Sequence, residues 1–90
     1  MNFPFKEEKI KENIFIRTFT QSVEDEDLVW HRDYEDRIVK CLEKTNWKFQ
    51  FDNELPISFD NEIFIPKGVY HRIIKGDGDL VIEVTKLNPL

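Results

Sequence analysis

The sequence predicts an all-β fold: a single domain over residues 1–90, built as a β-sandwich or jelly roll of about eight short strands. Short apolar or alternating runs recur along the chain, and they are rich in the β-branched and aromatic residues that strands favour. Polar segments typical of turns separate these runs. Little of the chain remains for helices, so the strands must form the core among themselves.

The first part of the chain contains three clear strand patterns and one helical one. Residues 5–13, "FKEEKIKEN", are the segment expected to form a helical turn or two. Residues 13–19, "NIFIRTF", alternate in hydropathy and predict a strand. Residues 28–33, "LVWHRD", follow the acidic loop "QSVEDED" and form the next predicted strand. In residues 46–52, "NWKFQFD", three aromatic side chains share one face, which we expect in the core.

One segment between these strands fits two structures. Residues 37–43, "RIVKCLE", are predicted as a strand because their neighbours are strands. Residues 35–44 also fit an amphipathic helix, since Ile38, Cys41 and Leu42 would then lie on one stripe. We prefer the strand, and the helix stays open as the alternative.

The C-terminal part predicts four more strands. Residues 56–59, "PISF", and 62–66, "EIFIP", are short and apolar. Residues 69–75, "VYHRIIK", and 80–87, "LVIEVTKL", are longer. They are joined by "GDG", a turn whose glycines suit positive φ angles.

The composition excludes several classes of function. The net charge is −5, with Lys and Arg scattered along the chain, whereas nucleic-acid binders usually present a clustered basic face. No apolar run approaches the ~20 residues of a membrane span. The start, "MNFPFKEEKIKEN", has no apolar h-region and carries acidic residues, so we expect no signal peptide. The single cysteine, Cys41, fits a reducing compartment. We therefore expect a cytoplasmic protein that binds neither nucleic acid nor membrane.

The chain has two histidines, and both stand in patterns that suggest metal ligands. His31 lies in "WHRDYEDR" and His71 in "PKGVYHR". In a strand, residues two apart face the same side, so His31 and Asp33 would project together. If the strand that carries His71 lies opposite, the three form a two-His, one-carboxylate set. With open positions left, that set favours Fe(II), and it also accepts Zn, Mn or Ni.

The segment "PKGVYH" resembles the second signature of the cupin superfamily, in which Pro-x-Gly is followed after two residues by a metal-binding His. The segment "HRDYEDRIVKCLE" is similar to the first signature, in which His-x-His is followed by Glu. The resemblance implies a cupin-type jelly-roll barrel (a double-stranded β-helix). It also implies that the rigid corner of Pro66 and Gly68 places His71 at the barrel mouth.

The chain departs from these signatures at two of the ligand positions. Asp33 stands where the family has the second His, and it is a replacement ligand. Arg37 stands where the family has Glu, and a guanidinium cannot bind a metal cation. Through "HRDxEDR", "W-x-FQ-x-D-x-ELP" and "YHR-x-IKG-x-x-DL", the whole chain also resembles short cupin-like proteins of marine T4-like phages.

These residues leave several functions open. In one interpretation, His31, Asp33 and His71 hold a divalent metal, and Arg37 orients a small anionic substrate through paired hydrogen bonds. In another, Asp33 and Arg37 simply pair and no metal binds. The protein would then be a module that binds a small ligand or a protein partner, or a structural component of a phage. We expect a homodimer, because so small a barrel gains stability by burying an edge or a face.

Overall fold

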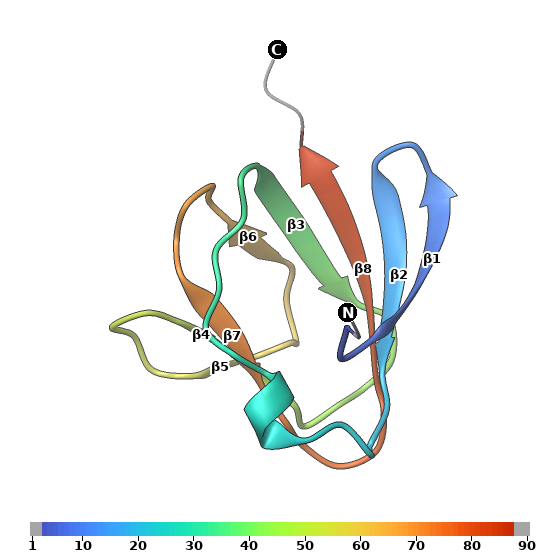
Figure 1. Ribbon diagram of the computed structural model, residues 1–90, viewed down its shortest axis with the longest axis vertical. Coiled ribbons are helices and arrows are strands. Elements are labelled where there is room, and N and C mark those ends of the chain that lie inside the picture. Colours follow the sequence, from blue (N-terminus) through green and yellow to red (C-terminus); the bar gives the residue numbers. More distant parts are fainter. Residues whose placement is uncertain (1–2, 88–90) are drawn as a thin grey trace.

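Residues 3–87 are described in the computed structural model, and they form eight strands and one short 3-10 helix, η1 (Figure 1). The elements are β1 (Lys6–Lys11), β2 (Ile14–Phe19), η1 (Asp25–Asp27), β3 (Asp36–Cys41), β4 (Lys48–Phe51), β5 (Ile57–Ser58), β6 (Ile63–Ile65), β7 (His71–Ile74) and β8 (Leu80–Leu87). The predicted all-β class is confirmed. Within this part of the chain, no helix is long and apolar enough to cross a membrane.

The strands form two antiparallel sheets that lie opposite each other (Figure 1). The larger sheet has the order β1-β2-β8-β3-β6, and the smaller one has the order β5-β4-β7. The chain crosses between the sheets repeatedly, as in a small jelly roll. The turn "GDG" therefore does not close a hairpin; it carries the chain from β7 in one sheet to β8 in the other.

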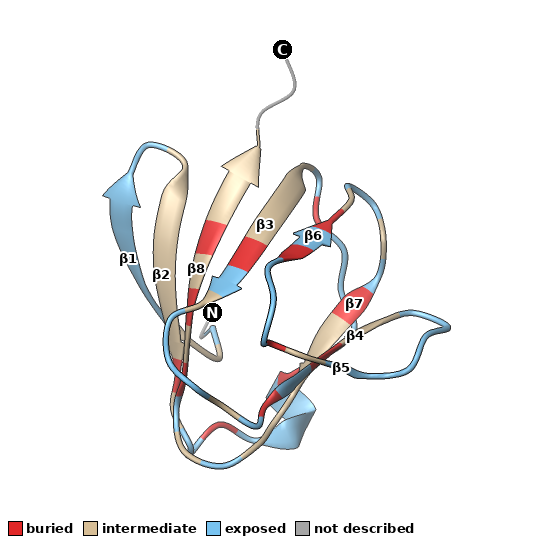
Figure 2. Cartoon of the chain, turned by 180° about the vertical axis from the view of Figure 1, so that it is seen from behind, coloured by how far each residue is buried: buried red, intermediate tan, exposed pale blue. Residues whose placement is uncertain are grey.

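The core lies between the two sheets, on their inner faces (Figure 2). Alternation along β8 buries Leu80, Ile82 and Val84, while the residues between them are only partly covered. The aromatic strand β4 contributes Phe49 from the opposite sheet, and Trp47 just before it is fully buried. The other buried apolar residues are Phe19, Val23, Leu28, Val39, Phe59, Ile63 and Ile65.

Trp47 connects the core to the turn between β7 and β8. Its indole Nε1 donates to the carbonyl oxygens of Asp77 and Gly78, at 3.2 and 3.1 Å. Gly76 lets the turn approach this closely, because a Cβ there would lie 2.7 Å from the backbone nitrogen of Trp47. Gly78 has a φ of 70°, so the expected positive φ is found at this one of the two turn glycines.

Two predicted elements are wrong. Residues 5–13 do not form helical turns, because Lys6–Lys11 are strand β1, paired with β2. Every residue of β1 is exposed, and a fully exposed strand can carry the same charged residues as a surface helix. The backbone pairing with β2 determines that the segment is a strand. Residues 28–33 do not form a strand either. Only His31 pairs, in a single bridge to His71.

The other predicted strands are present, with bounds that are the same or differ by one or two residues. The predicted strand over residues 37–43 corresponds to β3, Asp36–Cys41, so the strand is confirmed and the alternative helix over 35–44 is not formed. The last strand has the predicted bounds, Leu80–Leu87.

We predict that replacing Trp47 by Phe lowers the free energy of unfolding by about 2 kcal/mol, because it removes buried volume and leaves two carbonyls without their donor. The matched control is Trp30→Phe, since Trp30 is 41% exposed and Trp47 is 0% exposed. The control should change stability by less than about 0.5 kcal/mol. Urea unfolding followed by circular dichroism measures both. Equal midpoints for the two variants would contradict the prediction.

Candidate metal centre

A tight turn between β6 and β7 positions His71. The backbone nitrogen of Val69 donates to the carbonyl of Pro66 at 3.3 Å, and Gly68 has a φ of 83°, which other residues avoid. Gly68 also donates its backbone N–H to the carbonyl of Asp33 at 2.9 Å. His71 is the first residue of β7 and is only 3% exposed. The corner therefore both directs His71 inward and holds the segment that carries Asp33.

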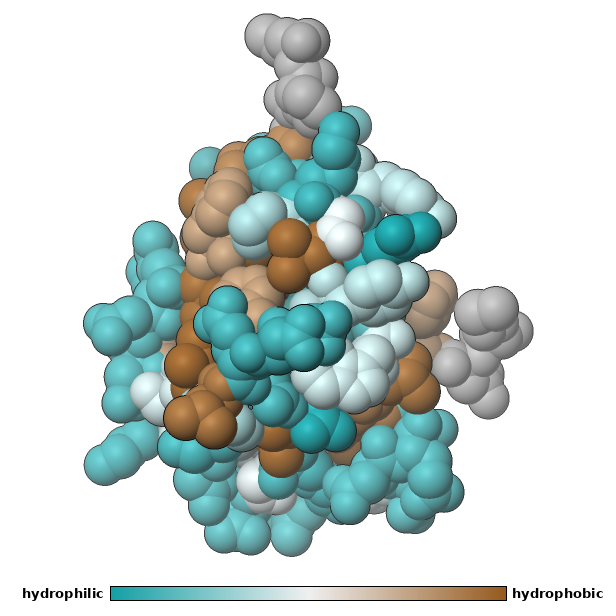
Figure 3. Space-filling model, turned by 90° about the vertical axis from the view of Figure 1, so that its left-hand side faces the viewer, coloured by the Kyte–Doolittle hydropathy of each residue, from teal (hydrophilic) through white to brown (hydrophobic). Residues whose placement is uncertain are grey.

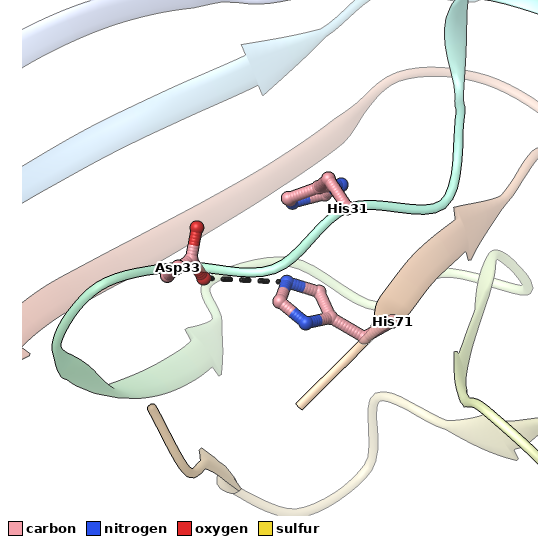
Figure 4. Close-up of side chains that lie close together, drawn as sticks. All are labelled: His31, Asp33 and His71. Atoms are coloured by element: carbon pink, nitrogen blue, oxygen red, sulfur yellow. Dashed lines mark ion pairs between the residues drawn. The ribbon is translucent and has the colours of Figure 1, made fainter. Parts of the chain in front are cut away.

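His31 is held against His71 by a pair of backbone hydrogen bonds. The nitrogen of His31 donates to the carbonyl of His71 at 3.0 Å, and the reverse bond is 2.9 Å. The two imidazoles lie side by side, with ring centroids 4.3 Å apart (Figure 4). The predicted convergence of the two histidines is thus observed, although an extended loop rather than a strand carries His31.

The residues on either side of this bridge pair on the outer face. The guanidinium of Arg72 lies 4.7 Å from the ring centre of Trp30, and that of Arg32 lies 5.2 Å from the ring centre of Tyr70. Such cation–π contacts stabilise exposed cross-strand pairs. Figure 3 shows the side of the molecule that carries the smaller sheet, where hydrophilic side chains are interspersed with apolar ones and with ones of intermediate hydropathy. Because alternate residues face opposite sides, these outer pairs leave the histidines facing inward.

Backbone carbonyls orient both imidazole rings. Nδ1 of His31 lies 3.1 Å from the carbonyl oxygen of Val29, and Nδ1 of His71 lies 2.9 Å from that of Val69. A carbonyl oxygen only accepts, so each Nδ1 carries a proton and each Nε2 of a neutral ring has a free lone pair. Histidines that ligate metals usually have this second contact, which fixes the ring and its tautomer. Partial burial, with a smaller effect of the neighbouring His71, lowers the pKa of His31.

Asp33 lies between a histidine and an arginine. Its Oδ2 is 3.3 Å from Nε2 of His71 (Figure 4), and its Oδ1 is 3.3 Å from Nη1 of Arg37. Burial by itself would raise the pKa of Asp33, but the contact with His71 and the charge of Arg37 outweigh it, so the pKa is lowered. Asp33 is therefore a carboxylate at neutral pH.

One buried oxygen of this group lacks a hydrogen-bond donor. Among residues 3–87, Oδ2 of Asp33 is buried without a hydrogen-bond partner. A neutral His71 has one N–H, and the carbonyl of Val69 takes it at the shorter distance. In that neutral form, the lone pair of Nε2 would face the carboxylate oxygen, and two acceptors would meet with no proton between them. A cation between them would satisfy both.

The donor atoms of His31, Asp33 and His71 are close enough to share an ion. All three lie within 4.8 Å of one another. Ligands bound at 2.0–2.2 Å to one metal lie about 3 Å apart, which matches the 3.3 Å between His71 and Asp33. His31 is exposed and the other two are buried, so the trio opens toward solvent on one side. The donor set and its spacing fit a divalent ion.

The trio lines a cavity of about 380 Å³ between the sheets. The wall of this cavity is mostly apolar, and its members from the strands include Phe19, Val39, Phe49, Ile65, Ile73 and Val84. Two arginines, Arg17 and Arg37, also line it. The cavity is therefore an apolar chamber with a few charged groups on its wall, as is usual for small-molecule sites.

Arg37 makes the pairing that the sequence left open. Besides Asp33, it contacts Oε1 of Glu35 through Nη2 at 3.0 Å and through Nε at 3.2 Å. Its predicted role in orienting a substrate stays a prediction. Arg17 was not among the predicted site residues, although alternation in "NIFIRTF" places it on the same face as Phe15 and Phe19.

Solved structures share this architecture. A cupin-2 domain protein from Shewanella frigidimarina NCIMB 400 gives a TM-score of 0.64 at 17% identity, over 97% of this chain and 83% of its own. The Fe(II) form of HppE gives 0.62 at 12% identity, over 82% of this chain and 41% of its own. A structure of the DMSP lyases RdDddP and RnDddQII gives 0.67 at 12% identity, over 83% of this chain. These likenesses show that the chain has the cupin fold.

The chain is much shorter than two of these proteins. It spans 37% of the DMSP lyase chain and 41% of HppE, so it corresponds to only part of each. No protein-family model and no curated protein matches the sequence.

We predict that His31 in the metal-free protein at neutral pH is neutral, with its proton on Nδ1, because the Val29 carbonyl fixes that tautomer. Nitrogen-15 NMR of the imidazole should show a protonated Nδ1 and an unprotonated Nε2, with assignment by His71→Ala. The urea-denatured protein, which lacks the carbonyl contact, is the control. A protonated Nε2 on His31 in the folded protein would contradict the prediction.

Proposed function

We propose that this cupin-fold protein binds one divalent metal ion through Nε2 of His31, the carboxylate of Asp33 and Nε2 of His71. The observation that carries the proposal is the buried Oδ2 of Asp33, which faces Nε2 of His71 at 3.3 Å and has no hydrogen-bond partner among the described residues. Buried polar atoms are nearly always satisfied, so such an atom calls for a missing partner. A metal ion is the partner that both acceptors can share.

The donor set favours Fe(II) among the divalent ions. Two imidazoles and one carboxylate with open positions form the facial triad of non-haem iron proteins, and Zn, Mn or Ni also accept these donors. The likeness to the Fe(II) form of HppE supports iron as the first metal to test.

A metal held by three side chains keeps open positions for a small ligand. When bound, such an ion supplies Lewis-acid or redox chemistry to an oxygen placed on it. The chain itself would orient the metal ligands and exclude water from the cavity. Arg37 fixes the Asp33 carboxylate, the carbonyls of Val29 and Val69 fix the two rings, and the apolar wall holds the body of the ligand. We propose a small anionic molecule as that ligand.

A metal-free binding module is the second candidate, because of one specific contact. The pairing of Asp33 with Arg37 at 3.3 Å can serve the fold alone, with the histidines as a polar lining of the cavity. A role in a phage, a homodimer and a cytoplasmic location are further parts of this proposal that need their own tests.

The first test is metal content. Protein purified without a His-tag or chelator should contain about one divalent ion per chain by plasma mass spectrometry. His71→Ala removes one of three ligands, so its affinity should fall by more than the roughly 10–100-fold that loss of an outer-sphere partner costs. The control is Glu62→Ala, which removes an exposed carboxylate away from the trio. A metal-free wild type that takes up neither Fe(II) nor Zn(II) would refute the metal site.

The second test separates the metal site from the ion pair. We predict that Zn(II) at about 100 times its dissociation constant raises the unfolding free energy of the wild type by about 2.7 kcal/mol. Asp33→Asn keeps the shape of the side chain but removes its charge, so Zn(II) should not stabilise this variant. Calorimetry with and without Zn(II) measures both. If Asp33→Asn lowers stability but Zn(II) has no effect on either protein, the metal-free candidate is favoured.

A further inference from the structure

Arg17 lies at the centre of β2 and enters the cavity from the larger sheet. Alternation along β2 puts Arg17 on the same face as Phe19, which is 4% exposed and belongs to the core. The side chain of Arg17 is only 15% exposed and lines the cavity. Most of this side chain is covered, and its guanidinium has five N–H groups that need partners from the protein, a ligand or water.

The protein itself supplies few of those partners. Nε of Arg17 donates to Oε2 of Glu7 at 2.6 Å, and the guanidinium lies 4.3 Å from the ring centre of Phe5. Glu7 is the register partner of Arg17 on β1, so this pair fixes the stem and the plane of the side chain. Within residues 3–87, neither Nη of Arg17 is hydrogen-bonded to another residue. The terminal fork of the guanidinium is therefore held in place with its donors free.

Arg37, the other arginine on the cavity wall, is in a different state. Its two Nη atoms and its Nε already face the carboxylates of Asp33 and Glu35. It is thus mostly neutralised within the protein, by an ion pair with Asp33 of the trio and by hydrogen bonds to Glu35. Of the two arginines, Arg17 is the one with donors to offer an incoming anion.

The backbone positions of Arg17 and of Arg37, which contacts the trio, are far apart along the larger sheet. In the larger sheet, Arg17 pairs with Ile82 on β8, and Arg37 pairs with Lys86 on the same strand. Those two positions on β8 are four residues apart, which corresponds to about 14 Å along the strand. Arg37 contacts Asp33, so the trio belongs to the Lys86 end. Most of the other residues that line the cavity are apolar, with Asp27 as one further acidic residue.

We propose that Arg17 is the anion-binding residue of the cavity, and that its ligand is a small elongated carboxylic acid. The carboxylate pairs with the two free Nη groups of Arg17 in bidentate fashion. A hydrocarbon body lies along the apolar wall, and the other end faces His31, Asp33 and His71. Only the placement of the ligand's other end rests on the metal site proposed above. The pairing of the carboxylate with Arg17 does not depend on it, since the contacts of Arg17 do not involve the metal ligands.

Titration calorimetry with hexanoate and 1-hexanol tests this pairing, because the two probes share a six-carbon body and differ in the charged head. The wild type should bind hexanoate more tightly than 1-hexanol. Arg17→Gln should weaken hexanoate binding by roughly 10–100-fold, the usual effect of losing charge-assisted hydrogen bonds, and leave 1-hexanol binding unchanged. Its metal content should equal that of the wild type.

Glu7→Gln is the matched second variant, and it remains informative if Arg17→Gln folds poorly. It removes a negative charge beside the proposed carboxylate, while the Gln oxygen can still accept from Nε of Arg17, so hexanoate binding should tighten by roughly two- to fivefold. Weaker or unchanged hexanoate binding in this variant would count against the proposal.

The titrations are run on Zn(II)-loaded and on metal-free protein, so that the two proposals can fail separately. A wild type that takes up no metal refutes the metal site, and the metal-free titration still tests Arg17. The proposal for Arg17 is overturned if hexanoate binds the wild type no more tightly than 1-hexanol. It is also overturned if Arg17→Gln leaves the affinity for hexanoate unchanged, or if that variant loses metal.

Discussion

The reciprocal backbone hydrogen bonds between His31 and His71 are the contact on which the site depends. They are the bridge by which the loop after η1 joins the smaller sheet, at 3.0 and 2.9 Å. Without them, Asp33 would not reach His71, and Arg37 would lose one of its two carboxylate partners. One isolated bridge is a weak unit of sheet structure, so the flanking cation–π pairs on the outer face and the bond from Gly68 to Asp33 support it.

The balance of charge in the site follows from which donors Asp33 can reach. One oxygen has the guanidinium of Arg37, and the other faces Nε2 of a histidine whose Nδ1 lies against a backbone carbonyl. A second arginine or a lysine beside that oxygen would complete the site without metal, but none is paired with it among the described residues. Asp33 is therefore held in place by Arg37, while its Oδ2 has no hydrogen-bond partner among the described residues.

The sequence predicted the parts of the molecule in which side-chain pattern and backbone pairing agree. Strand β8 alternates strictly, so its bounds and its buried face could be read from the residues. The segment 28–33 has the composition of a strand, but β7 begins at His71 directly after the turn of Pro66 to Val69, so the residues after His31 have no strand to pair with. Residues 5–13 carry a helix-like charge pattern, and a long-range partner, β2, determines that they form a strand.

The site was predictable to the extent that spacing determines direction. His31, Asp33 and His71 were found because a two-residue spacing and a Pro-x-Gly corner have defined geometry. Arg17 was not, because an arginine inside an alternating apolar run reveals its inward direction only when both faces of the strand are known. The missing hydrogen bond at Asp33 depends on which carbonyl orients the ring of His71, and no local pattern encodes that contact.

The positions of the three donors along the chain also bear on how the molecule is held together. His31 and Asp33 lie on a loop, whereas His71 begins a strand of the smaller sheet, so an ion shared by them would be a covalent-like tie between residue 31 and residue 71. Domains of this size bury a smaller share of their surface than larger ones, so a cross-link adds to a modest stability. With one cysteine, this chain cannot form an internal disulfide. Bringing residues 31 and 71 together in the unfolded chain is entropically costly. A metal bound by both would therefore stabilise the fold in the way that a disulfide does.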